Sequence, residues 1–148
     1  MKKKLFVITF CLLAIFSANA QSISKNTIGL RFGDNNGIGG EFSYQRKLGN
    51  INRLELNLGL RNDFEDFKAT ALYEWVWKLE GHFNWYAGAG GGLINSSGTA
   101  IFGAGVIGIE YNFDIPLLIS LDYRPEIGIT RSYDGFHSDF GLGIRYQF

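Results

Sequence analysis

The chain has 148 residues, with 14 basic and 14 acidic side chains, 20 glycines, 2 prolines and 16% aromatic residues. A chain of this length makes one domain. Its balanced charge, without a clustered basic face, argues against a nucleic-acid partner. Frequent glycines and aromatics without blocks of helix-forming residues favour an all-β fold.

The N-terminus has the features of a secretion signal. Lys2–Lys4 is a basic start, Leu5–Phe16 is an apolar run, and Ala18-Asn19-Ala20 offers an A-x-A cleavage site. The apolar run is shorter than the roughly 20 residues that a membrane-spanning helix needs. We therefore expect cleavage near Ala20, giving a signal peptide (1–20) and a mature domain (21–148). Cys11 lies inside the signal, so the mature domain has no cysteine and carries a charge of about −3.

In the mature domain, apolar residues alternate with polar residues or glycine. Successive side chains of a β-strand point to opposite faces, so each alternating segment predicts a strand with one apolar face. The strict period of two also excludes an amphipathic helix for the leucine-rich segment 51–61. Eight segments follow the pattern: Asn26–Gly33, Ile38–Arg46, Ile51–Arg61, Lys68–Lys78, Phe83–Leu93, Ala100–Phe113, Leu117–Thr130 and His137–Phe148.

The segments between these strands are turns and short loops. An even number of strands in up-and-down order brings both ends of the chain to the same side, which we expect to be the periplasm. Segments 47–50, 79–82 and 114–116 are then periplasmic, and segments 34–37, 62–67, 94–99 and 131–136 face outward. The outer loops are somewhat longer on average, as in outer-membrane barrels.

Alternation alone does not decide which face is inside. A soluble lipocalin-like barrel would bury its apolar face around a ligand, whereas a membrane barrel would turn that face to lipid. The polar face is rich in glycine and poor in lysine, which suits a crowded lumen, and strands of about 9–14 residues suffice for a tilted crossing. Aromatic residues near the strand ends indicate interfacial girdles. They are Tyr44, Trp77, Phe83, Trp85, Tyr111, Tyr146 and Phe148 near one rim, and Phe32, Phe102 and Phe140 towards the other.

These features predict a closed antiparallel up-and-down eight-stranded transmembrane β-barrel with charged residues in its lumen. Both signs are well represented, so a paired network that plugs the barrel is the simplest interpretation, and an ion or proton path is the alternative. Neutralising Glu74 or Arg124 should then lower stability. The expected lumen residues are Arg31, Glu41, Arg53, Glu55, Arg61, Glu74, Lys78, Glu110, Asp122, Arg124, Glu126, Asp139 and Arg145.

Catalytic and metal sites have little support in the sequence. His137, Ser138 and Asp139 are adjacent, but neighbouring residues of one strand point alternately in and out and cannot converge as a triad. His82 is expected at the opposite rim, so no two histidines have metal-ligand spacing. We therefore expect no enzymatic activity, no metal and no cofactor.

The chain resembles small eight-stranded outer-membrane barrels of the OmpA/OmpX type and the single-domain barrels common in Bacteroidetes. The resemblance rests on the expected signal peptide, the eight amphipathic segments and the terminal Tyr146-Gln147-Phe148. The resemblance implies a monomer in the bacterial outer membrane, with lipid and the barrel-assembly machinery as partners. The resemblance is almost silent on activity, and the function we expect is a non-enzymatic envelope role: structural, surface interaction or minor conductance. The assembly signal in the last strand would be Phe140, Leu142, Ile144, Tyr146 and Phe148.

Overall fold

The structure is a computed structural model that describes residues 23–33, 40–61 and 65–148. The expected signal peptide and its cleavage site lie outside these residues, so the proposed division of the chain at Ala20 stays a prediction. None of the helices in the described part is long and apolar enough to cross a membrane.

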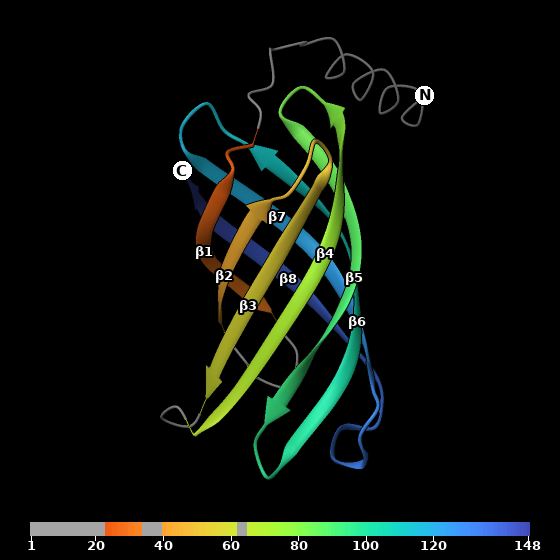
Figure 1. Cartoon of the computed structure of the whole chain (residues 1–148). Helices are drawn as coiled ribbons and strands as arrows, with labels where there is room; N and C mark the ends of the chain where they lie inside the picture. The colour runs from red at the N-terminus through yellow and green to blue at the C-terminus, as the bar shows by residue number, and fades with distance from the viewer. Residues whose placement is uncertain (1–22, 34–39, 62–64) are drawn as a thin grey trace, which may run out of the picture.

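Eight strands form one closed antiparallel barrel in which each strand pairs with its neighbours in the chain (Figure 1). The last strand pairs with the first, which confirms the predicted all-β, up-and-down, eight-stranded fold. The strands are β1 (Asn26–Gly33), β2 (Glu41–Lys47), β3 (Asn52–Arg61), β4 (Asp66–Glu80), β5 (Phe83–Asn95), β6 (Thr99–Asn112), β7 (Leu117–Gly128) and β8 (Gly135–Gln147).

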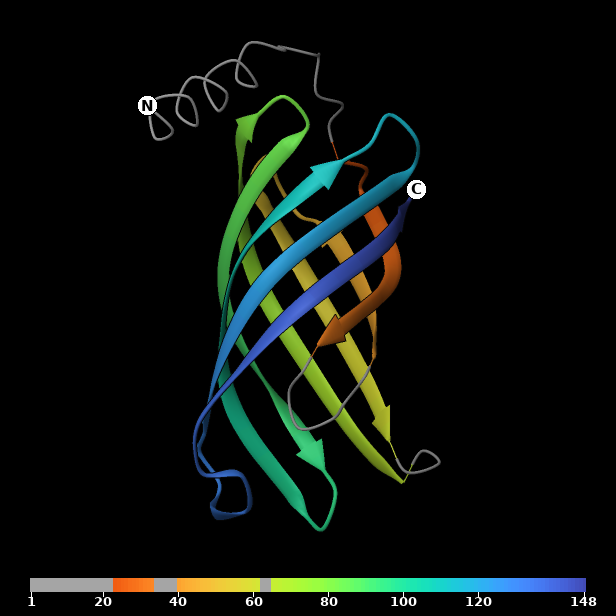
Figure 2. The ribbon, with the colours of Figure 1, turned by 180° about the vertical axis from the view of Figure 1, so that it is seen from behind.

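The barrel has two different ends. At one end, which we call the terminal rim, β1 begins, β8 ends, and the backbone of Asn26 exchanges two hydrogen bonds with that of Phe148 (3.1 and 2.9 Å). The β2–β3, β4–β5 and β6–β7 turns lie at this rim (Figure 1). The β5–β6 and β7–β8 connections lie at the opposite, distal rim, and the second contains a short 3-10 helix, η3 (Arg131–Tyr133) (Figure 2).

The strand register sets the width and tilt of the barrel. Starting at Thr27 on β1 and stepping to the paired residue on each following strand leads to His137 on β8. Where β1 and β8 pair directly, however, Thr27 is opposite Gln147. The register therefore advances by ten residues around the barrel, from 137 to 147. With a rise of about 3.3 Å per residue and a strand spacing of about 4.8 Å, the strands tilt by roughly 40°. A barrel of this width has room mainly for side chains.

The distribution of side chains is inverted relative to a soluble protein. Among the described residues, 20 polar or charged side chains are buried in the lumen but only 7 hydrophobic ones are. The outer wall instead carries exposed large hydrophobics, such as Phe42 (61%), Ile107 (53%) and Ile127 (61%). Soluble proteins rarely expose apolar surface on this scale, and they seldom bury charges without partners.

The inner apolar residues gather on β4, β5 and β6. Leu72, Tyr86, Phe102, Ala104 and Val106 form one cluster inside the barrel. Phe102 is buried (1% exposed), so its expected position in an aromatic girdle is wrong. The reason is its register: it pairs with Gly92 and Gly128 and has the same facing as Ala104, Val106 and Glu110, which point inward. The missing side chain at Gly92 makes room for the Phe102 ring.

Candidate functional site: the charged lumen

The structure places eleven of the thirteen expected lumen residues inside the barrel. Lys78 is a correction: it is exposed at the terminal rim, because β4 continues beyond Trp75, the partner of the first residue of β3. Arg61 ends β3, and its side chain lies outside the described part of the structure. The eleven buried residues are Arg31, Glu41, Arg53, Glu55, Glu74, Glu110, Asp122, Arg124, Glu126, Asp139 and Arg145.

The sequence interpretation missed one lumen cation, Lys68. It begins the alternating segment on β4 and faces the same way as Thr70, Leu72 and Glu74, which all point inward. Its side chain is 3% exposed and its Nζ lies 2.7 Å from Oε1 of Glu126. Extending the period of two by one step towards the N-terminus would have found it.

The largest set of ion pairs, the central cluster, is centred on Arg31. Its guanidinium binds Asp122 (Nη2–Oδ1, 2.5 Å), Asp139 (Nη1–Oδ2, 2.6 Å) and Glu41 (Nη1–Oε2, 3.4 Å). The three carboxylates come from β7, β8 and β2, so one side chain cross-links three walls of the barrel. Arg31 is fully buried, and its planar fork of five donors suits several acceptors at once.

The central cluster continues through two further arginines. Arg124 joins Oε2 of Glu41 to Oε1 of Glu55, with both distances 3.1 Å. Arg145 binds the other oxygen of Glu55 at 3.2 Å and donates to the hydroxyls of Ser43 (2.9 Å) and Ser120 (2.7 Å). Arg31, Arg124 and Arg145 thus form one chain of ion pairs across the lumen.

Towards the terminal rim lies a smaller terminal cluster. Arg53 binds Glu74 (Nε–Oε2, 2.5 Å) and Glu110 (Nη1–Oε2, 2.6 Å), and its Cζ lies 4.6 Å from the centre of the Tyr86 ring. The cation–π contact and the two ion pairs hold the guanidinium in place. One oxygen of Glu74 and Nη2 of Arg53 are buried without a hydrogen-bond partner.

At the distal end, Lys68 and Glu126 form a separate pair. Glu126 also accepts a hydrogen bond from the Tyr133 hydroxyl (2.9 Å), and Lys68 Nζ lies 5.0 Å from the centre of the Phe102 ring. Tyr133 belongs to η3, so the β7–β8 connection reaches into the lumen at this end. The contact ties the distal connection to the charge network.

The network is unbalanced in charge. The buried charged residues of the described part comprise five cations and seven carboxylates, a formal charge of −2. Each of these groups has a hydrogen-bonded or ionic partner, which limits the cost of keeping charges out of water. The arrangement is therefore suited to cross-linking the walls and filling the lumen.

Glycines make the room that the arginines need. A side chain at Gly141 would collide with the guanidinium of Arg31, and one at Gly143 would collide with that of Arg145. Both glycines lie on β8 and face inward between Asp139 and Arg145. In so narrow a barrel, alternation of large and small residues lets the cross-linking side chains lie across the axis.

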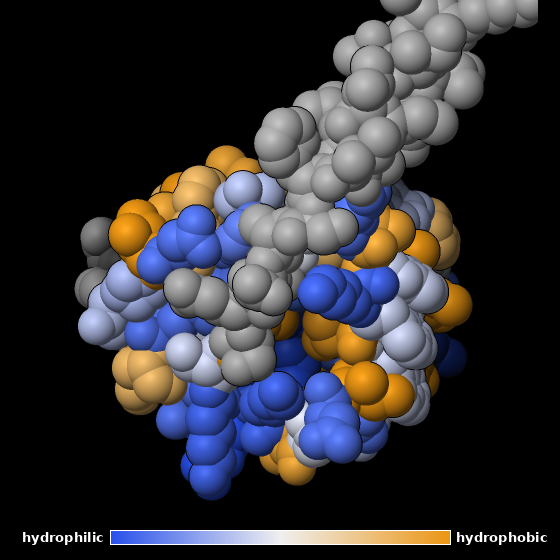
Figure 3. Space-filling model, turned by 90° about the horizontal axis from the view of Figure 1, so that it is seen from above, coloured by the Kyte–Doolittle hydropathy of each residue, from blue (hydrophilic) through white to orange (hydrophobic). Residues whose placement is uncertain are grey.

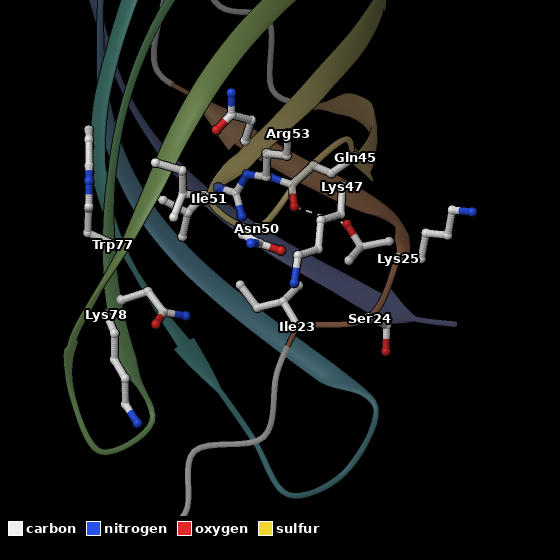
Figure 4. Close-up of a pocket in the computed structure, with 14 residues that line it drawn as sticks. Ile23, Ser24, Lys25, Gln45, Lys47, Asn50, Ile51, Arg53, Trp77 and Lys78 are labelled. Carbon is white, nitrogen blue, oxygen red and sulfur yellow. Dashed lines mark hydrogen bonds between the residues drawn. The ribbon is translucent and has the colours of Figure 1, made fainter.

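A cavity of about 360 Å³ opens at the terminal rim (Figure 4). Its lining includes Lys25, Lys47 and Lys78, and Arg53 of the terminal cluster. Apolar side chains such as Ile51 and Trp77 complete it. Seen from above, hydrophilic residues lie among hydrophobic ones at this rim (Figure 3).

The interfacial aromatics expected near the terminal rim lie there and interact in pairs. Trp77 and Trp85 stack with their ring centres 4.4 Å apart, and Phe83 meets Tyr111 edge to face at 4.8 Å. The Tyr44 hydroxyl donates to Asn26 (2.9 Å). The expected assembly residues, four in β8 and one at the C-terminus, all face outward and are 41–62% exposed: Phe140, Leu142, Ile144, Tyr146 and Phe148.

The histidine, serine and aspartate considered as a possible triad do not come together in the described structure. His137 stacks on Tyr133 (4.1 Å), Ser138 is exposed, and Asp139 is buried against Arg31. His82 lies at the terminal rim, where Nδ1 is 2.8 Å from the carbonyl oxygen of Asn112. No group of three or more metal-ligating side chains occurs within residues 23–33, 40–61 and 65–148.

Comparison with known proteins finds similarity in fold alone. No family profile matches the chain, and no curated protein matches it in sequence. A de novo designed transmembrane β-barrel superposes with a TM-score of 0.63 at 14% identity, covering 87% of this chain and 99% of that one.

The crystal structure of Neisserial surface protein A (NspA) gives a TM-score of 0.57 at 13% identity, covering 86% of this chain and 100% of that one. The solution NMR structure of the designed TMB2.3 gives 0.59 at 15% identity, covering 86% and 97%. At these identities the comparisons establish the barrel fold.

Proposed function

We propose that this protein is an integral outer-membrane β-barrel whose lumen is closed by its charge network. The observation that carries the proposal is the inverted distribution of side chains, with charges inside and large hydrophobics outside. Lipid can solvate such a wall, and a closed barrel leaves no unpaired strand edge in the hydrocarbon. The fold shared with designed transmembrane β-barrels and with NspA supports the proposal.

The alternative, a soluble lipocalin-like barrel, would need an apolar interior for its ligand. The described lumen is instead lined mainly by polar and charged side chains, and its apolar cluster packs around Phe102. In water, the 27 exposed large hydrophobics of the described part would form patches that cause aggregation. The arrangement therefore favours the membrane.

Within this function, we infer a non-enzymatic envelope role, either structural or in surface interaction. The predicted secretion signal near the N-terminus supports the envelope location, and the separation of His137, Ser138 and Asp139 supports a non-enzymatic role. The outward apolar face of β8 suits contact with lipid and, during insertion, with the barrel-assembly machinery. A monomer is sufficient, because the barrel closes on itself.

Fractionation tests the location. The full chain, expressed in a Gram-negative host, is expected to stay in the outer membrane after carbonate washing and to change its gel mobility when heated. The expectation rests on the apolar wall, which holds the barrel in lipid, and on the closed ladder, which resists unfolding in detergent at room temperature. Recovery of the folded chain in the soluble periplasmic or secreted fraction would overturn the proposal.

Planar-bilayer recording tests the closed lumen. The central cluster and the Phe102 cluster fill the barrel, so we expect the wild-type protein to give no steady ionic current across the bilayer. The Phe102→Gly variant removes a large side chain from the lumen. Its recording shows what current a widened barrel gives, for comparison with the wild type. A steady conductance of the wild type would instead favour the ion path.

A further inference from the structure

Arg46 is unusual among the charged residues of the first three strands. Arg31, Glu41, Arg53 and Glu55 point into the lumen, and Lys47 lines the cavity at the terminal rim. Among the described side chains of β1, β2 and β3, Arg46 alone is a charge on the outer face, where it is exposed. It has no hydrogen bond or ion pair with any described residue. Within the described parts of these three strands, Arg46 is thus the one cation that the outer wall presents to its surroundings.

The strand register places Arg46 in a row of hydrogen-bonding groups. Arg46 pairs with Asn26 on β1 and with Leu54 on β3, which in turn pairs with Tyr73 on β4. The Asn52 amide donates to the Tyr73 hydroxyl. The Asn26 amide oxygen accepts from the Tyr44 hydroxyl. The N–H groups of Asn26 and the O–H of Tyr73 are therefore able to donate to a ligand. We call Asn26, Arg46 and Tyr73, together with Asn52 from the adjacent row nearer the terminal rim, the polar row.

An apolar groove lies on the outer wall next to the polar row, on the side towards the distal rim. It has a volume of about 500 Å³ and runs across β1 to β5 in the next two rows of paired residues. Tyr44 and Leu56 lie on its side towards Arg46. The groove exists because Ala69, Ala71 and Gly91 are small where neighbouring outward residues are large.

We propose that the polar row and the groove bind one anionic phospholipid, with an acyl chain in the groove and the phosphate at Arg46. The proposal rests on the proposed membrane location, which fills an apolar groove with acyl chain and not with water. A guanidinium forms strong, charge-assisted hydrogen bonds with phosphate, and its neighbours Asn26 and Tyr73 supply further donors. The site would lie in the leaflet at the terminal rim.

The charge on Arg46 selects this occupant over a second copy of the chain. A two-fold contact between grooves would bring the same surface of two copies together. Two unpaired Arg46 side chains would then approach each other in a medium of low dielectric, which is unfavourable. An anionic headgroup satisfies the guanidinium, whereas a second barrel leaves it without a partner.

Native mass spectrometry of the full protein released from detergent micelles tests the headgroup. With equal amounts of phosphatidylglycerol and phosphatidylethanolamine of identical chains, we expect one bound lipid and about fivefold preference for phosphatidylglycerol, as for one basic side chain at an anionic surface. Arg46→Gln should abolish the preference. Lys47→Gln, which removes the same charge from the adjacent residue facing the cavity, should retain it.

A second pair of variants tests the groove. Ala71→Leu fills it and is expected to lower the binding of both lipids at least threefold, whereas Ala87→Leu, on the outer face of β5 beside Trp75 and Ile107 and outside the groove, should leave both unchanged. Equal binding of the two lipids to wild type, an unchanged preference in Arg46→Gln, or unchanged binding to Ala71→Leu would overturn the site. A dimer mass without lipid would also overturn it. The heat-dependent gel shift reports separately whether the barrel is folded, so failure of the lipid site is distinct from failure of the membrane proposal.

Discussion

Replacing Arg31 by methionine is expected to destabilise the folded barrel by about 3–5 kcal/mol. Arg31 is fully buried and contacts the carboxylates of Asp122, Asp139 and Glu41. Methionine fills part of its volume but leaves the carboxylates without this partner, and the described buried residues already have a formal charge of −2. The cost is that of uncompensated buried charge, in addition to the lost cross-link between β2, β7 and β8. Urea titration in detergent or lipid vesicles measures the free energy of unfolding.

Two variants serve as matched controls for the Arg31 prediction. Glu74→Gln should cost about 1 kcal/mol or less, because the amide still accepts from Arg53, and Arg53 keeps Glu110. Lys78→Met, at an exposed rim position, should be neutral within about 0.5 kcal/mol. Adding Asp122→Asn to Arg31→Met should recover part of the loss. An Arg31→Met protein as stable as Lys78→Met would show that the central cluster does not hold the barrel together.

Replacing Leu121 by arginine is expected to cost about 2–4 kcal/mol when the barrel folds into lipid vesicles. Leu121 is 52% exposed on β7 and pairs with Ile109 and Leu142, so its side chain lies on the outer wall away from either rim. A guanidinium there would lie in hydrocarbon, far from water and headgroups. In a soluble barrel the same exposed position would tolerate arginine with a change of about 0.5 kcal/mol or less.

The control for Leu121 is Ile115→Arg. Ile115 is also exposed (60%), but it lies in the β6–β7 turn at the terminal rim, where an arginine reaches the headgroups. We expect this variant to fold into vesicles like the wild type. Equal stability of the Leu121 and Ile115 variants in lipid would contradict the assignment of the outer wall to the hydrocarbon, whatever the state of the lumen.

The local pattern of the sequence determined which residues face inward. Leu54, Leu56 and Leu58 alternate with Arg53, Glu55 and Asn57, and this period of two is a property of the extended backbone that does not depend on partners. For the same reason, most of the lumen charges and the number of strands could be predicted. The errors arose where the pattern is weak or stops. Phe102 lies in a half-strand rich in glycine and alanine, and Lys78 continues the alternation past the end of the closed wall.

Tertiary structure alone decided which charges meet. Arg31 binds Glu41 ten residues away but also Asp122 and Asp139, which are 91 and 108 residues away, and Arg46 lies above the groove only because four strands align their rows. These neighbours depend on a register that accumulates to ten residues around the barrel. A shift of one residue in any ladder would turn that strand's charges from the lumen to the outer wall, since facing alternates along the strand. The sequence by itself determined facing, a local property of one strand, whereas contact across the lumen required the closed register of all eight.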